Sequence, residues 1–111
     1  CWLKQVEDAS AYGVVGFDTI GQINSIEEKP QFPKSNLAIT GCYLFDSQVW
    51  SLLKQVEPSA RGELEITDVL NLYLQKNQLT YTIYNDTWLD MGTFDGWLNV
   101  SKEIRNKTNE K

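Results

Sequence analysis

The chain has 111 residues and a net charge of −5, and 41% of its residues are hydrophobic, a composition typical of one globular domain with a modest core. Without a bilayer-length apolar run, a signal segment or a basic face, it is expected to bind neither a membrane nor a nucleic acid. The absence of histidine excludes histidine triads, metal sites and general bases. Two cysteines without metal-ligand spacing predict free thiols in a reducing compartment, hence a cytoplasmic protein.

The first part of the sequence has the pattern of short strands. Residues 1–6 fit a short strand, and residues 11–18 and 19–29 together predict a hairpin around a glycine-containing turn. After a loop set by two prolines, residues 37–46 (LAITGCYLFD) predict a strand that is apolar on both faces, and such a strand lies in the middle of a sheet. The residues expected on one face of this strand are Ile39, Gly41, Tyr43 and Phe45.

The period then changes from that of a strand to that of a helix. Asp46 or Ser47 can cap a helix that Pro58 ends. A second helix follows a polar link and ends near Asn77. The apolar residues expected on the inner faces are Val49, Trp50, Leu53 and Val56 in the first helix and Ile66, Val69, Leu70, Tyr73 and Leu74 in the second.

The last part of the chain predicts one more strand and one more helix. Residues 79–85 alternate as a strand, residues 86–95 form a loop, and residues 96–111 begin as an amphipathic helix and end as a charged tail. The apolar face of this helix would carry Trp97, Val100 and Ile104. The order β, β, β, α, α, β, α, after the short first strand, is that of a mixed α/β fold in a single domain.

Chemistry-bearing side chains gather first at the end of the hairpin, where Glu27, Glu28 and Lys29 precede Pro30. Neighbouring side chains of a strand face opposite sides, so Glu28 faces away from the other two. A carboxylate can accept paired hydrogen bonds from sugar hydroxyls, and a lysine can meet a phosphate as a point charge. We expect Pro30 to hold Lys29 in extended geometry. The alternative is a charged strand end in solvent.

Arg61 is the second candidate and lies in the link SARGELEITD before the second helix. Its planar guanidinium suits bidentate binding of phosphate. The alternative is an arginine in solvent. Three acidic residues around it, Glu63, Glu65 and Asp68, suit the first turn of a helix through the helix dipole.

Asp90 and Gly41 mark two further places. Asp90 follows the apolar pair Trp88 and Leu89 and precedes a glycine turn, so it could ligate a hard cation such as Mg²⁺ or simply cap the turn. Gly41 inside an apolar strand leaves room for a ligand or another backbone, and Tyr43 beyond it offers a hydroxyl or a ring. The alternative there is a bulge beside a core tyrosine.

Four stretches occur in the same order and at nearly the same spacing as in glucose-1-phosphate thymidylyltransferases: YGVVGFD, SIEEKPQFPKSNLAITGCYLFD, PSARGELEITDVLNLYL and WLDMGTFD. From about Val6 to about Ile104 the chain resembles this family of sugar nucleotidyltransferases, which make dTDP-glucose from dTTP and glucose 1-phosphate. The resemblance covers only the second half of the family's catalytic domain. It implies an α/β fold with a mixed sheet, the C-terminal half of a nucleotide-diphospho-sugar transferase without the N-terminal Rossmann-like half that binds the nucleotide.

The resemblance also implies a role for each candidate. Glu28 would bind glucose hydroxyls, Lys29 would contact the sugar phosphate, and Arg61 would bind phosphate. Asp90 would help to hold Mg²⁺, and Glu27 would be structural. The remaining residues of the sugar pocket would be Tyr12, Gly13, Ile39, Gly41 and Tyr43, with Trp88 supporting the loop of Asp90.

Two hypotheses of different classes follow from this comparison. In the first, the chain derives from a thymidylyltransferase, binds glucose 1-phosphate or a related sugar phosphate, and cannot turn over without the half that cradles the triphosphate. In the second, it is a stand-alone interaction module whose exposed sheet face forms a homo-oligomer. A uridylyl or adenylyl specificity is a further alternative, because the base-reading residues lie outside the chain.

Overall fold

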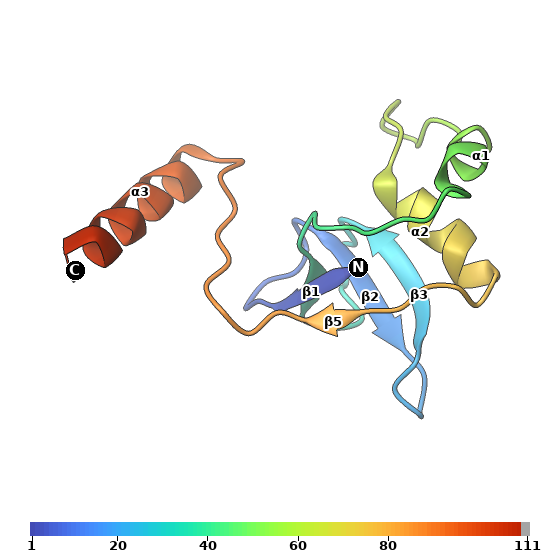
Figure 1. The fold of residues 1–111 in the computed structure, drawn as a ribbon, viewed down its shortest axis with the longest axis horizontal. Helices are drawn as coiled ribbons and strands as arrows, with labels where there is room; N and C mark the ends of the chain where they lie inside the picture. Colours follow the sequence, from blue (N-terminus) through green and yellow to red (C-terminus); the bar gives the residue numbers. More distant parts are fainter. Residues whose placement is uncertain (110–111) are drawn as a thin grey trace.

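A computed structural model describes residues 1–109 of the chain. Its elements are β1 (Trp2–Gln5), β2 (Gly13–Phe17), β3 (Ile23–Glu28), β4 (Leu37–Ile39), α1 (Val49–Leu53), α2 (Ile66–Gln75), β5 (Thr82–Ile83) and α3 (Phe94–Asn109). The predicted mixed α/β order is confirmed, and so is the short first strand (Figure 1). None of the described helices has the length and apolar character needed to cross a bilayer.

The five strands form one mixed sheet in the order β3-β2-β4-β1-β5. All neighbouring strands are antiparallel except β1 and β5, which are parallel. The predicted hairpin is confirmed as β2 and β3, and its turn contains Gly21 with φ of 80°. The strand β4 lies between β2 and β1, as its apolar sequence predicted. The strand expected over residues 79–85 pairs only at Thr82 and Ile83.

The strand predicted over residues 37–46 is wrong in its length, because β4 ends at Ile39. The chain turns at Gly41, whose φ of 79° lies in the left-handed region that favours glycine. The side chains of Tyr43 and Phe45 nevertheless pack against the core, as their alternation predicted. A glycine turn therefore interrupts the strand without changing which of these side chains face inward.

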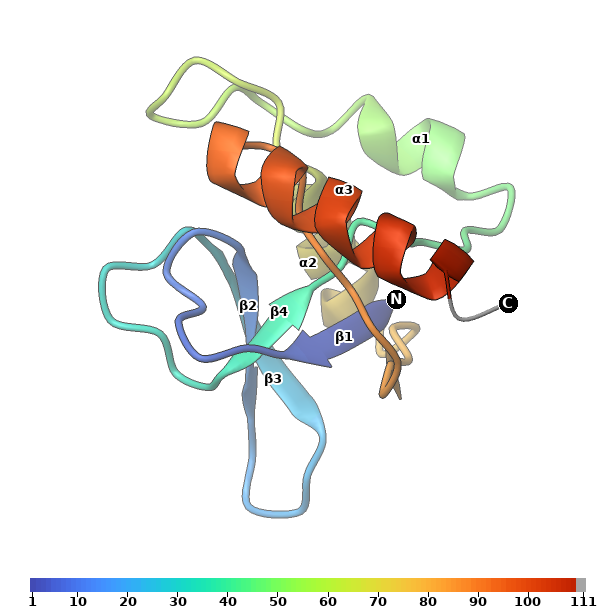
Figure 2. The ribbon, with the colours of Figure 1, turned by 90° about the vertical axis from the view of Figure 1, so that its left-hand side faces the viewer.

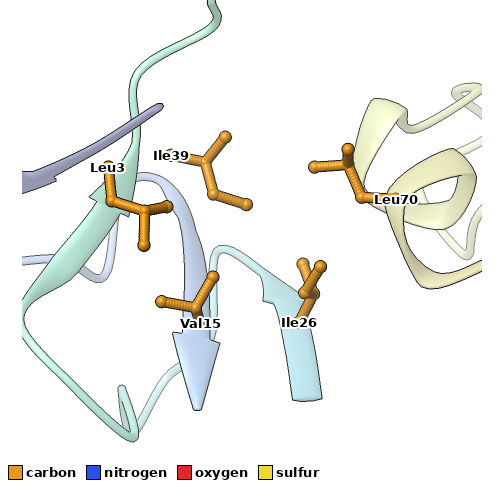
Figure 3. Close-up of a cluster of buried hydrophobic side chains, with 5 residues drawn as sticks. All are labelled: Leu3, Val15, Ile26, Ile39 and Leu70. Carbon is orange, nitrogen blue, oxygen red and sulfur yellow. The ribbon is translucent and has the colours of Figure 1, made fainter. Parts of the chain in front are cut away.

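The helix α2 packs on one face of the sheet and completes the core. Its Leu70 faces side chains from four different strands, as Figure 3 shows. The cluster consists of Leu3, Val15, Ile26, Ile39 and Leu70, all of them buried. The apolar stripe predicted for this helix is confirmed at Val69, Leu70 and Tyr73, whereas Ile66 at its start is exposed.

The helix α1 is shorter than predicted and buries a different residue. It spans only five residues, and Asp46 supports its start by accepting a hydrogen bond from the Gln48 N–H at 3.0 Å. Its contact with α2 buries Leu52. The expected inner residues Trp50 and Leu53 are instead exposed, with 71% of Trp50 accessible. Packing against α2 therefore selects the face of this helix.

The helix α3 stands away from the sheet at the end of a long connection (Figures 1 and 2). It begins at Phe94, two residues before the predicted start. Its Trp97 and Ile104 are 59% and 60% exposed, so the predicted apolar face is not buried within the described part of the chain. The last two residues of the expected charged tail, 110 and 111, lie outside the described residues.

A hydrogen bond between Tyr73 and Asp46 joins α2 to the segment before α1. The Tyr73 hydroxyl donates to the Asp46 carboxylate at 2.7 Å. Burial, with the Asp46 bond added, raises the pKa of Tyr73 to about 12. The same bond, followed by the bond from Gln48, holds the pKa of Asp46 below its usual range.

Replacing Leu70 by alanine should reduce the free energy of unfolding by about 2–5 kcal/mol, because it removes the one helix side chain that closes the sheet cluster. Urea unfolding followed by circular dichroism measures this loss. Leu98→Ala on the exposed face of α3 is the matched control, with an expected change within about 0.5 kcal/mol. Equal effects of the two substitutions would contradict the described position of α3.

Tyr73→Phe should flatten the dependence of stability on pH at both ends. Because the folded pKa of Asp46 is lowered, its contribution is present above pH 3.8 and is lost as the pH falls further. Because the folded pKa of Tyr73 is raised, its contribution is present below pH 10.0 and is lost as the pH rises toward about 12. Urea unfolding midpoints measured across this pH range test the prediction, with Tyr84→Phe at an exposed tyrosine as the control. If the midpoints of Tyr73→Phe varied with pH as those of the wild type do, the prediction would be refuted.

Candidate functional site

Two neighbouring pockets at one end of the hairpin contain all ten candidate residues. Pocket A, of about 220 Å³, is lined by eight of them: Tyr12, Gly13, Glu28, Ile39, Gly41, Tyr43, Trp88 and Asp90. Pocket B, of about 280 Å³, holds Lys29 and Arg61. The two pockets share Glu28 and Thr67. The candidate ring side chains therefore line pocket A, and the two candidate cations line pocket B, where the carboxylates of Glu65 and Asp68 accompany them.

Gly13 forms part of the floor of pocket A, directly across the hairpin from Glu28. A Cβ at Gly13 would lie 2.8 Å from Cγ2 of Thr67 and 3.2 Å from the Glu28 carboxylate. The absence of a side chain at this position therefore lets α2 approach the end of β3. It also leaves the Glu28 carboxylate room beside the strand.

Thr67 is a site residue that the sequence reasoning missed. It is 2% exposed, it lies in the first turn of α2, and it lines both pockets. The signal was available, because Thr67 falls on the same helical stripe as Leu70 and Leu74. A hydroxyl on an otherwise apolar stripe next to candidate residues indicates a polar function or contact.

Lys29 does not have the extended geometry expected before Pro30. Its φ is 45°, in the left-handed region. Its N–H still donates to the Tyr12 carbonyl at 2.9 Å, which holds Lys29 at the end of the hairpin while Pro30 turns away from the sheet. This pairing overrides the preference for extended geometry before proline. The left-handed conformation costs about 1–2 kcal/mol for a residue with a side chain.

Glu27 lies apart from the two pockets and forms an ion pair with Lys34. Neither of these residues lines pocket A or pocket B. This arrangement agrees with the expected alternation of Glu27 and Glu28 on opposite sides of β3. The expectation that Lys29 also faces away from Glu28 is wrong, because the left-handed Lys29 lines pocket B together with Glu28.

Arg61 is held by carboxylates rather than lying free in solvent. Its Nε and Nη2 donate to Oε1 of Glu65 at 3.2 and 2.8 Å. Its Nη2 also lies 3.2 Å from Glu63. The hydrogen bond to Glu65 raises the pKa of Arg61 above its ordinary value. One edge of the guanidinium is therefore already occupied, which leaves less of it for bidentate binding of a phosphate than the sequence suggested.

The loop of Asp90 is fixed to the hairpin by an aromatic pair. The rings of Tyr12 and Trp88 meet edge to face, with centroids 5.3 Å apart. Burial raises the pKa of the Tyr12 hydroxyl, and the charges of Asp90 and Asp8 raise it further. The expected apolar enclosure of Asp90 is wrong, because Asp90 and Leu89 are both exposed and Trp88 is only half-buried.

Asp90 is the one candidate metal ligand. One of its carboxylate oxygens accepts the N–H of Gly92 at 3.1 Å. Within residues 1–109, the structure contains no group of three or more His, Cys, Asp or Glu side chains placed to hold an ion. A single hard carboxylate is nevertheless compatible with Mg²⁺, which often binds one or two protein carboxylates and takes its other ligands from substrate phosphates and water.

A larger cavity, of about 570 Å³, lies between Tyr43 and α2 and contains neither Lys29 nor Arg61. Asp46 is the only charged side chain among its lining residues. Because no lysine or arginine lines this cavity, pockets A and B, which hold the ten candidates, remain the candidate site.

Comparison with known proteins identifies relatives that share most of this chain. A glucose-1-phosphate thymidylyltransferase from Mycolicibacterium smegmatis is 45% identical over 90% of this chain and 35% of its own length. One from Actinoplanes is 50% identical over 90% of this chain and 34% of its own length. The chain therefore spans about a third of the length of these curated relatives.

Two solved structures share the fold. A Bacillus anthracis protein described as a glucose-1-phosphate thymidylyltransferase, crystallised with sucrose, is 44% identical, with a TM-score of 0.83 over 94% of this chain and 42% of its own. A UDP-glucose pyrophosphorylase complexed with UDP-glucose has a TM-score of 0.85 over 96% of this chain and 43% of its own, and at 24% identity it shows the fold alone. The nucleotidyl transferase family model matches residues 1–107, and the chain belongs to that family.

Proposed function

We propose that the chain is the sugar-phosphate-binding part of a glucose-1-phosphate thymidylyltransferase, the C-terminal half of its catalytic domain. The main support is the division of the site at Glu28. Pocket A offers a carboxylate and hydroxyl groups, and pocket B offers Lys29 and Arg61. A glucose 1-phosphate has hydroxyls at one end and a dianion at the other, so it matches this division.

Each group in the site has a role in this proposal. Glu28 accepts hydrogen bonds from glucose hydroxyls, and Gly13 opposite it lines the same pocket without a side chain. Burial and the Glu28 charge raise the pKa of Tyr43, so this hydroxyl keeps its proton and can donate. Lys29 meets the phosphate as a point charge, and Arg61 donates the N–H groups that Glu65 leaves free. The remaining lining of the sugar pocket is Tyr12, Ile39, Gly41 and Trp88.

The reaction that we assign to the complete protein is an in-line displacement at phosphorus. An oxygen of the sugar phosphate forms a bond to the α-phosphorus of dTTP, while the bond from that phosphorus to the leaving pyrophosphate breaks. Lys29 and Arg61 would position the attacking phosphate and stabilise its charge. Mg²⁺, held in part by Asp90, would neutralise charge on the transferring group when bound. None of these roles requires a histidine.

We further propose that this chain does not catalyse turnover alone. It spans about a third of the length of its curated relatives, and its sequence contains no Gly-rich loop for a triphosphate. The residues that bind the nucleotide, those that select its base and a second set of metal ligands would come from a segment outside this chain. A cytoplasmic location is part of the same proposal, on the basis of the family resemblance.

A second candidate function is that of an interaction module that forms a homo-oligomer. The observation in its favour is the apolar surface of α3, where Phe94 is 93% exposed and Trp97 is 59% exposed. Within the described chain this surface packs on no other element, whereas apolar faces of helices are normally buried.

Calorimetric titration of the chain with glucose 1-phosphate and Mg²⁺ tests the proposed function. Lys29→Ala should weaken binding by about tenfold to a hundredfold, the loss of one charge-assisted contact. Lys34→Ala is the matched control, because Lys34 pairs with Glu27 away from both pockets, and it should leave the affinity unchanged. If the folded wild-type chain bound no sugar phosphate and light scattering gave a dimer mass, the interaction module would replace the enzyme fragment.

Comparing Lys29→Gly with Lys29→Ala should separate the effect of the amine on ligand affinity from the effect of the backbone conformation on stability. Both Lys29→Ala and Lys29→Gly remove the amine and should lose the same affinity. Glycine accepts the left-handed backbone at φ of 45°. In urea unfolding, the free energy of unfolding of Lys29→Gly should therefore exceed that of Lys29→Ala by about 1 kcal/mol. Equal stabilities would show that Lys29 relaxes to another conformation, and the amine would then not be aimed into pocket B by its backbone.

A further inference from the structure

Glu65 holds Arg61 more firmly than an exposed salt bridge would. Only 11% of the Glu65 side chain is accessible, and its Oε1 accepts both Nε and Nη2 of Arg61. Two donors on one carboxylate oxygen restrict the direction of the guanidinium more than a single hydrogen bond would. The hydrogen bonds from Arg61 and then Ser59 lower the pKa of Glu65, so it stays charged at neutral pH.

Ser59 fixes Glu65 from the other side. Its hydroxyl donates to the same Oε1 at 2.9 Å and accepts the N–H of Arg61 at 3.2 Å. The backbone between them is a closed turn, in which the N–H of Gly62 donates to the Ser59 carbonyl at 2.8 Å. Gly62 has φ of 75°, which permits this turn. The turn and the carboxylate together determine where the guanidinium can lie.

One terminal nitrogen of Arg61, Nη1, is not held by its carboxylate partners. Within residues 1–109 the structure gives its Nη1 no hydrogen-bond partner, whereas Nε and Nη2 are bonded to Glu65. Lys29, Arg61 and Glu65 all line this pocket. Nη1 is therefore the Arg61 nitrogen whose N–H groups remain to donate to an anion in this pocket while Glu65 stays in place.

We propose that Glu65 is a positioning residue that orients Arg61 toward an anion in pocket B. It acts through Arg61 and does not itself touch the ligand. An arginine side chain has many rotamers, and fixing it before the ligand arrives reduces the ordering that binding would otherwise require. This inference rests on the proposed function, because it assumes that the anion is the phosphate of a sugar phosphate.

The carboxylate of Glu65 also has an opposite effect, because it repels an anion. The two effects can be separated by substitution. Glu65→Gln removes the charge but keeps an oxygen that can accept from Arg61, whereas Glu65→Ala removes both. If orientation dominates, the glutamine variant should bind like the wild type and the alanine variant should bind less tightly. If repulsion dominates, both variants should bind more tightly.

Phosphate titrations of the full 111-residue chain test this inference, with inorganic phosphate and glucose 1-phosphate as the probes. Glu65→Ala should weaken binding of glucose 1-phosphate by about threefold to tenfold, and Glu65→Gln should restore most of the affinity. Glu63→Ala is the matched control, because Glu63 is exposed and contacts only Nη2; it should not weaken binding. Affinities for the alanine variant equal to or above the wild type would overturn the proposal.

Nuclear magnetic resonance of the Arg61 Nε–H separates a loss of side-chain orientation from a loss of the fold. The wild type should show a rigid Nε–H before ligand is added, and Glu65→Ala should make it mobile while the backbone signals stay in place. A rigid Nε–H in Glu65→Ala would also overturn the positioning role. Absence of binding by the wild type would instead refute the proposed function, and the positioning role toward a ligand would fall with it.

Discussion

The contact between Leu70 and the sheet determines where the two pockets meet. Leu70 packs among side chains from β1, β2, β3 and β4, and so it fixes α2 along and across the sheet. The start of α2 then lies over the pair of Gly13 and Glu28, where Thr67 enters both pockets. One helical turn corresponds to about 5.4 Å, so a shift of α2 by a single turn would separate Arg61 from Lys29. An apolar contact thus sets the spacing of the charged groups.

Around this contact, the site departs from what local preferences favour. Lys29 has a left-handed backbone, and Gly13 stands where even a Cβ would lie 2.8 Å from Cγ2 of Thr67. Arg61 is bound to Glu65 within its own segment. Such departures cluster at functional sites, because binding requires groups in positions that a stable fold alone would not select.

Elements with a local sequence pattern were predicted correctly. The predictions were wrong where contacts between elements determine which residues are buried. The hairpin and the inner face of α2 follow from alternation and helical period, and both are confirmed. The inner face of α1 depends on α2, which no local pattern reveals, so Trp50 was assigned to the wrong side. The family motifs identified ten residues that do lie together, whereas Thr67 was missed because its spacing resembles that of a core residue. The orientation of Arg61 depends on Glu65, and spacing alone cannot show it.

The aromatic contact between Tyr12 and Trp88 has a consequence for the order in which the chain folds. These two rings lie far apart in the sequence, and their contact joins the loop that carries Asp90 to the start of the hairpin. Contacts between distant parts of a chain form late, because closing a long loop costs entropy before any contact is gained. We therefore expect this contact to form late in folding, as the pairing of β1 with β5 does, and the carboxylate that would meet a metal to be among the first groups to leave its place when the chain opens locally.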